Sequence, residues 1–111
     1  MVIMKLLTKK IKDKLLKNGL DSQRAEVKFF NPCGSGTWVV SGMDKNEDTM
    51  WCLADIGAGC CEQGTVSLAE LKSVRLQFGL KIERDLHFNP RGKELKDYAD
   101  GYEKDGTLAG C

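Results

Sequence analysis

The sequence predicts a single α+β domain, in which a small antiparallel sheet of three or four strands carries two main helices on one face. Two stretches place apolar residues along one stripe at helical spacing, and four stretches between short turns have the alternation of strands. A chain of 111 residues is long enough to bury one modest core. We expect residues 1–92 to form the compact domain. Residues 93–111 are expected to form a polar extension, with a weak helix over 93–103 followed by a frayed tail.

The composition is that of an ordinary soluble protein, with 41% hydrophobic and 30% charged residues. The net charge of +1 gives no overall field that would recruit a nucleic acid or a membrane. The apolar start "MVIMKLL" is too short for a signal-peptide core, and lysines follow it rather than precede it. We therefore expect a cytoplasmic protein that has no membrane partner.

The first predicted helix covers residues 8–18, where Thr8 is placed to cap the start and Gly19 the end. Its apolar stripe consists of Leu7, Ile11, Leu15 and Leu16. Its basic patch consists of Lys9, Lys10, Lys12 and Lys14. Charge runs on helices are usually solvated faces, and this is our preferred interpretation. The alternative is a binding patch for phosphate groups or an acidic partner.

The central part of the chain predicts three antiparallel strands. They cover residues 25–30, 37–43 and 49–56, and the polar residues 44–48 form a hairpin loop between the last two. Trp38 and Trp51 are expected to pair across this hairpin as an aromatic cluster, with base stacking as the alternative role.

The next segment predicts a loop and then a helix. The glycine-rich stretch "GAGCCEQG", residues 57–64, is expected to be an irregular loop. Ser67 and Glu70 have the spacing of a capping box, so a helix should begin at Leu68 and end at Gly79. Its buried stripe is expected to contain Leu68, Leu71, Val74 and Phe78.

A fourth strand is predicted over residues 80–88, in which Arg84 shares the apolar face. The other members of that face are Ile82, Leu86 and Phe88. Glu83, Asp85 and His87 point the other way and should form an exposed polar edge that contacts whatever the protein binds.

Arg84 is expected to be chiefly structural, because a guanidinium on a core-facing position needs a carboxylate partner. Asp55 is the first choice for this partner and Glu62 the second. An arginine that reads a ligand or a partner protein is the alternative.

The sequence offers little for catalysis. His87 is the only histidine, which excludes two-histidine metal sites, and we interpret it as a surface or packing residue rather than an acid or base. None of the five cysteines has CxxC spacing, which predicts reduced thiols without zinc. They are Cys33, Cys52, Cys60, Cys61 and Cys111. No nucleophile elbow, Walker A loop or dinucleotide fingerprint occurs, so we expect no catalytic residue and no cofactor.

Three stretches together carry a family resemblance: "MKLLTKKIKDKL", "EVKFFNP" with "TWVVSGMD", and "GTVSLAELKSVRLQFGLKIERDLHF". From Met4 to Arg91 the chain resembles the small bacterial and phage proteins grouped as domain of unknown function 2958. The resemblance implies a compact α+β domain carried on phages, plasmids and integrative elements, with the segment "IERDLHF" as its hallmark. It supplies no catalytic residue.

Three classes of function follow. The first is a non-enzymatic interaction protein of a phage or mobile element, for instance an inhibitor of a host defence component, whose partner is a host-encoded or element-encoded protein. The second is a nucleic-acid-binding accessory that uses the lysine-rich helix. The third is a small-molecule binder or minor enzyme built around Arg84, Asp55 and His87. We rank them in this order.

Overall fold

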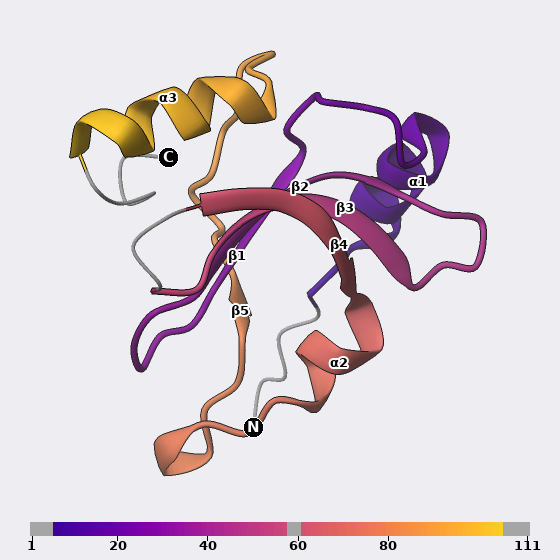
Figure 1. The fold of residues 1–111 in the computed structure, drawn as a ribbon. Helices are drawn as coiled ribbons and strands as arrows, with labels where there is room; N and C mark the ends of the chain where they lie inside the picture. Colours follow the sequence, from indigo (N-terminus) through magenta and orange to yellow (C-terminus); the bar gives the residue numbers. More distant parts are fainter. Residues whose placement is uncertain (1–5, 58–60, 106–111) are drawn as a thin grey trace.

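The protein is an α+β domain with a five-stranded antiparallel sheet, as predicted in class but with one strand more than expected (Figure 1). The computed structural model describes residues 6–57 and 61–105, of which residues 101–105 by their backbone alone. In chain order the elements are α1 (Lys9–Asn18), β1 (Val27–Phe30), β2 (Thr37–Met43), β3 (Thr49–Asp55), β4 (Cys61–Ser67), α2 (Leu68–Ser73), the 3-10 turn η1 (Gln77–Gly79), β5 (Glu83–Arg84) and α3 (Leu95–Asp105). The strands lie in the order β4-β3-β2-β1-β5. No helix in this part of the chain is long and apolar enough to cross a membrane.

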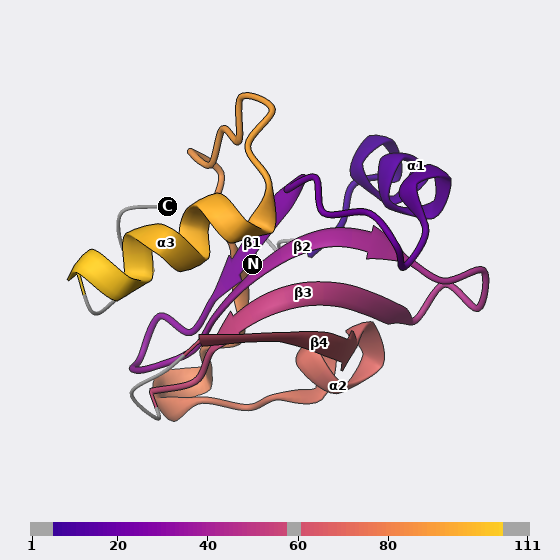
Figure 2. The same cartoon turned by 45° about the horizontal axis from the view of Figure 1, so that its top comes forward.

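Each face of the sheet has its own core cluster. On one face, Val27, Phe29 and Val40 pack with residues of α1 and α2, and we call this the α1/α2 face. On the other, Val39 and Leu53 pack against α3, which makes this the α3 face. Figure 2 shows α2 and α3 on opposite sides of the sheet. The two predicted helices therefore do share a face, and the C-terminal helix covers the other.

The two predicted helix starts are confirmed by their caps. The Thr8 hydroxyl accepts a hydrogen bond from the Ile11 N–H at 3.2 Å, and the Ser67 hydroxyl accepts one from the Glu70 N–H at 3.2 Å. Asp48 adds a second cap to α2, because its carboxylate accepts from the Ala69 N–H at 2.8 Å. This backbone bond, followed by one from the Ser67 hydroxyl, lowers the pKa of Asp48.

Helix α2 ends at Ser73, so the expectation of a helix reaching Gly79 is wrong. From Val74 the backbone is extended, and both Val74 and Leu76 pack on the core in that conformation. The chain then turns through η1, where Phe78 is 93% exposed. Its predicted place in the buried stripe is therefore also wrong.

Strand β4 lies where the sequence predicted an irregular loop over 57–64. It pairs antiparallel with β3 from Thr49 opposite Ser67 to Asp55 opposite Cys61. The strand is at the edge of the sheet and none of its seven residues is fully buried. Its pairing depends on backbone groups, so no apolar alternation marks it in the sequence. Cys60 lies outside the described residues.

A β-bulge at Ser41 separates the two tryptophans. Met43 lies opposite Met50. If this register continued along the hairpin, Trp38 would lie opposite Asp55 and on the same face as Trp51. Instead the register shifts between Val40 and Gly42, and Trp38 lies opposite Ala54. A shift of one residue exchanges the faces, so Trp38 is on the α1/α2 face and Trp51 on the α3 face. The predicted aromatic cross-strand pair is therefore wrong.

Strand β5 is much shorter than the predicted 80–88. The Asp85 carboxylate accepts a hydrogen bond from the His87 N–H at 2.9 Å, and this Asx-turn ends the strand. Ile82 is buried on the α1/α2 face as expected. Beyond the turn, Leu86 is 64% exposed and Phe88 packs on the α3 face, so these two do not continue the predicted apolar face.

The C-terminal helix α3 is part of the compact fold. Leu95 and Tyr98 are buried on the α3 face, and the rings of Phe88 and Tyr98 lie 5.8 Å apart. The boundary expected after residue 92 therefore does not separate this helix from the domain. The end of the predicted tail, residues 106–111 with Cys111, lies outside the described residues.

Candidate functional site

Arg84 and its two proposed partners lie on different strands of the sheet. Arg84 is opposite Phe29 on β1, on the α1/α2 face, whereas Asp55 and Glu62 are on β3 and β4. At about 4.8 Å per strand, the order β4-β3-β2-β1-β5 puts these positions about 14 Å and about 19 Å from β5. Asp55 also faces the α3 side, since it lies opposite Thr37, the neighbour of Trp38. The prediction that Asp55 or Glu62 pairs with Arg84 is therefore wrong.

The guanidinium of Arg84 instead holds the N-terminal segment against the sheet. Its Nη1 donates a hydrogen bond to the Leu6 carbonyl at 3.1 Å, and the side chain is half-buried. Leu6 itself is buried in the core cluster of the α1/α2 face. Arg84 thus links two segments that are far apart in the sequence.

Arg84→Ala is expected to lower the free energy of unfolding by about 1.5–3 kcal/mol, the usual contribution of a hydrogen bond from a charged donor. This is less than breaking a buried ion pair would cost. Urea denaturation measures the difference, and Lys81→Ala, at an exposed position nearby in the chain, is the control. A variant as stable as the wild type would show that the bond to Leu6 contributes nothing to the fold.

The buried ion pair of this sheet lies on its other face, where sequence reasoning did not place it. Lys28 is only 8% exposed, and its Nζ lies 3.6 Å from the Asp85 carboxylate. Asp85 was expected on an exposed polar edge, but it is half-buried in this pair. Of the other residues of that predicted edge, Glu83 is half-buried and His87 is exposed. The sequence did contain a signal for this pair, because Lys28 stands between Val27 and Phe29. Alternation along a strand puts Lys28 on the opposite face of the sheet from these two residues.

The lysine patch of α1 is exposed but partly neutralised. Lys9 forms an ion pair with Asp13 at 2.8 Å, which raises the pKa of Lys9, and Lys12 pairs with Glu47 of the hairpin loop. Lys9, Lys10 and Lys14 are solvent-exposed, and Lys12 is half-buried. Two of the four lysines therefore already have acidic partners within the protein.

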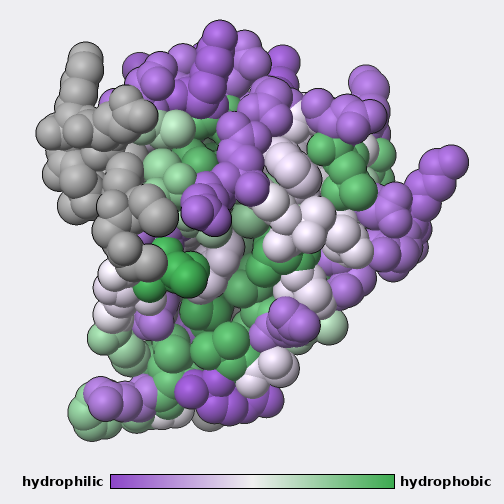
Figure 3. Space-filling view, viewed as in Figure 1, coloured by the Kyte–Doolittle hydropathy of each residue, from purple (hydrophilic) through white to green (hydrophobic). Residues whose placement is uncertain are grey.

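Large apolar side chains are exposed at the end of the sheet where β1 turns into β2. Turn η1 lies beside this end, because the Cys33 thiol is 3.9 Å from the Gln77 carbonyl. We call Ile56, Phe78 and Leu80, which are 67%, 93% and 41% exposed, the apical surface. The β1–β2 turn and the η1 turn lie at the lower left of Figure 1. Figure 3 shows further apolar side chains gathered over the middle of the same view.

Phe78 has an unusual backbone conformation. Its φ of 60° and ψ of 24° lie in the left-handed region, which a bulky residue rarely adopts. Such a conformation costs about 1–3 kcal/mol and persists only where the surroundings impose it. Gly79, with φ of 73°, continues the turn. The chain therefore holds a large aromatic ring in solvent at the cost of backbone strain.

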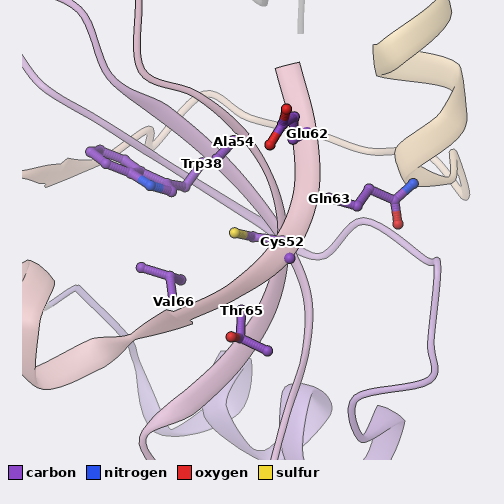
Figure 4. Close-up of a pocket in the computed structure, with 8 residues that line it drawn as sticks. Trp38, Cys52, Ala54, Glu62, Gln63, Thr65 and Val66 are labelled. Atoms are coloured by element: carbon purple, nitrogen blue, oxygen red, sulfur yellow. The ribbon is translucent and has the colours of Figure 1, made fainter. Parts of the chain in front are cut away.

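A shallow hollow of about 210 Å³ lies beside this end on the α1/α2 face. It is lined by Trp38, Cys52, Ala54, Glu62, Gln63, Gly64, Thr65 and Val66. Figure 4 shows Trp38, Cys52 and Val66 on one side of β4 and Gln63 on the other. Burial raises the pKa of the Cys52 thiol to about 12, so this thiol is neutral near pH 7 and is not a nucleophile. Glu62 was predicted as a site residue, but the hollow depends on β4, which was not predicted.

In the part of the chain that the structure describes, Arg84, Asp55 and His87 do not form the small-molecule or enzyme site that the third class of function requires. Arg84 and Asp55 are on opposite faces with two strands between them, and the hollow is not lined by Arg84 or His87. Within residues 6–57 and 61–105, no group of three or more His, Cys, Asp or Glu side chains is arranged to hold a metal ion.

The fold and its surface define a small α+β protein with an exposed apolar end. The chain belongs to the family described as protein of unknown function (DUF2958), whose family model matches residues 6–109. The resemblance is thus confirmed, and the match extends past the expected Met4–Arg91 to include α3. No curated protein matches the chain. No solved structure matches it either.

Proposed function

We propose that the protein is a non-enzymatic protein-binding module whose main anchor is Phe78. The observation that carries this proposal is a phenylalanine that is 93% exposed and held at positive φ. Burying such a ring in a partner is worth about 1.5–3 kcal/mol, and aromatic anchors of this kind dominate protein interfaces.

The neighbours of Phe78 support a binding role. Leu80, two residues further along the chain, and Ile56, at the same end of the sheet, are also large exposed apolar residues, whereas a single exposed apolar residue would need no explanation. In the free protein the Phe78 ring makes almost no packing contribution to offset the strain of its backbone. A complex would provide that contribution, because it would bury the ring without changing the turn.

The charges around Phe78 indicate what kind of partner fits. Arg75 and Lys81 flank it in the chain, both are exposed, and no acidic residue lies between them. The Arg75 guanidinium is held by the Lys72 and Val74 carbonyls. A partner with an apolar pocket and carboxylates at its rim would complement this arrangement.

The biological setting that we propose is the one that the sequence resemblance implies, and the site itself does not indicate it. Small proteins of this kind on phages and mobile elements would act in the host cytoplasm, on a host-encoded or element-encoded partner. Inhibition of a defence component is the form of this proposal that can be tested directly. Phage plating on a defended host should rise when the wild type is expressed, and should not rise with Phe78→Ser.

The binding proposal is tested by capture on immobilised protein. A partner should be retained by the wild type and by the control Leu86→Ser, which changes an exposed apolar residue beyond the Asx-turn. The immobilised Phe78→Ser variant should not retain this partner. With the identified partner purified, Phe78→Ser should weaken the Kd by about 30-fold, which corresponds to about 2 kcal/mol. Equal affinity of the wild type and Phe78→Ser would contradict the proposal.

A further inference from the structure

We infer that the outer edge of β4 pairs with β4 of a second copy of this chain, forming one continuous sheet across a two-fold axis. This inference rests on β4 alone and is independent of Phe78. In the described part of the chain, β4 pairs with β3 only and is the first strand of the sheet.

The backbone groups available for pairing can be assigned from the register. The Leu68 N–H donates to the Asp48 carbonyl at 2.9 Å, one position beyond the pair of Thr49 and Ser67. Backbone bonds of an antiparallel strand alternate from side to side. Even-numbered residues of β4 therefore bond to β3, and the N–H and C=O groups of Gln63 and Thr65 point outward, away from β3.

Strand β4 has few of the features that normally protect an edge. Over its seven residues it contains no proline, no lysine and no arginine, and its register with β3 is uninterrupted. The opposite edge, β5, is only two residues long. A long, regular edge strand of this kind is a template for another strand.

The sequence of β4 favours a second copy in antiparallel orientation. Pairing centred on Gly64 places Gln63 opposite Thr65 of the other copy, so that outward-pointing backbone groups meet each other. It places Glu62, the one charged residue of the strand, opposite Val66. A parallel arrangement would put the two Glu62 carboxylates side by side, which is destabilising.

Antiparallel pairing would also complete the hollow. Glu62 and Val66, which both belong to the edge strand β4, line the hollow. Val66 of the second copy would lie beside Glu62 and extend the wall of the hollow on the α1/α2 face. The two hollows would then adjoin across the two-fold axis.

The variant Thr65→Pro tests the inference because it removes one outward N–H and leaves the bonds to β3 in place. Proline is tolerated at edge positions where the N–H faces solvent. Thr65→Ala is the matched control, since it changes the side chain and keeps the N–H. In sedimentation equilibrium, the wild type and Thr65→Ala should reach twice the mass of the chain as concentration rises, and Thr65→Pro should remain a monomer.

Hydrogen exchange of the wild type provides a second measurement that does not depend on how the proline variant folds. Protection of the Gln63 and Thr65 amides should rise with protein concentration, while that of Gly64 and Val66 should not change. A wild type that stays monomeric at the highest concentration would overturn the inference. So would a dimer in which the Gln63 and Thr65 amides gain no protection.

Discussion

Gly42→Ala is expected to cause the largest loss of stability of any single methyl addition in the sheet. A Cβ at this position would lie 1.7 Å from the Gly19 carbonyl oxygen and 2.8 Å from its carbon. Both are backbone atoms at the C-terminal cap of α1, so the helix would have to move away from β2. Overpacking usually costs about 1–3 kcal/mol. We expect at least the upper end of that range, measured as the free energy of unfolding in urea.

Gly64→Ala is the control for this variant, because it adds the same methyl group to the same sheet. No heavy atom lies within 4 Å of the Cβ that it would introduce. Its stability should stay within about 0.5 kcal/mol of the wild type, as for most surface changes. A loss equal to that of Gly42→Ala would show that the cost comes from changing any glycine and not from the contact with α1.

Phe29→Ala is expected to cost about 3–5 kcal/mol, the usual loss when a large core residue is truncated. Phe29 is completely buried in the centre of the α1/α2 face, between Arg84 on β5 and Trp38 on β2. A domain of this size has only about 5–15 kcal/mol of total stability. The variant should therefore show a much lower melting temperature by circular dichroism, or fail to fold.

Phe78→Ala removes the same ring from a solvent-exposed position and is the matched comparison. Because the ring is almost fully exposed, its removal should leave the melting temperature unchanged. A loss comparable to that of Phe29→Ala would mean that Phe78 stabilises the folded protein. Its role as an anchor for a partner would then lose its support.

The elements that the sequence predicted well are those with local signals. The caps of α1 and α2 involve residues three positions apart, and both helices begin where the sequence indicated. The hairpin of β2 and β3 has a short polar loop, and its strands were also found. In each case the information lies within a few residues and needs no knowledge of the rest of the fold.

The features that were missed depend on contacts between distant segments. Strand β4 is held by backbone bonds at an edge, so its side chains carry no apolar alternation. The exposure of Phe78 depends on where the chain leaves the core after Leu76, which helical spacing alone cannot indicate. The partner of Arg84 depends on strand order, and strand order is a property of the whole sheet.

The bulge at Ser41 gives the protein two independent optical reporters. The indole of Trp38 lines the hollow beside the apical surface, whereas the indole N–H of Trp51 donates to the Gln63 side chain at 3.0 Å on the face that α3 covers. Replacing one tryptophan by phenylalanine would leave emission from a single side of the sheet. Binding of a partner at the apical surface and detachment of α3 from the sheet could then be followed separately by fluorescence in the same molecule.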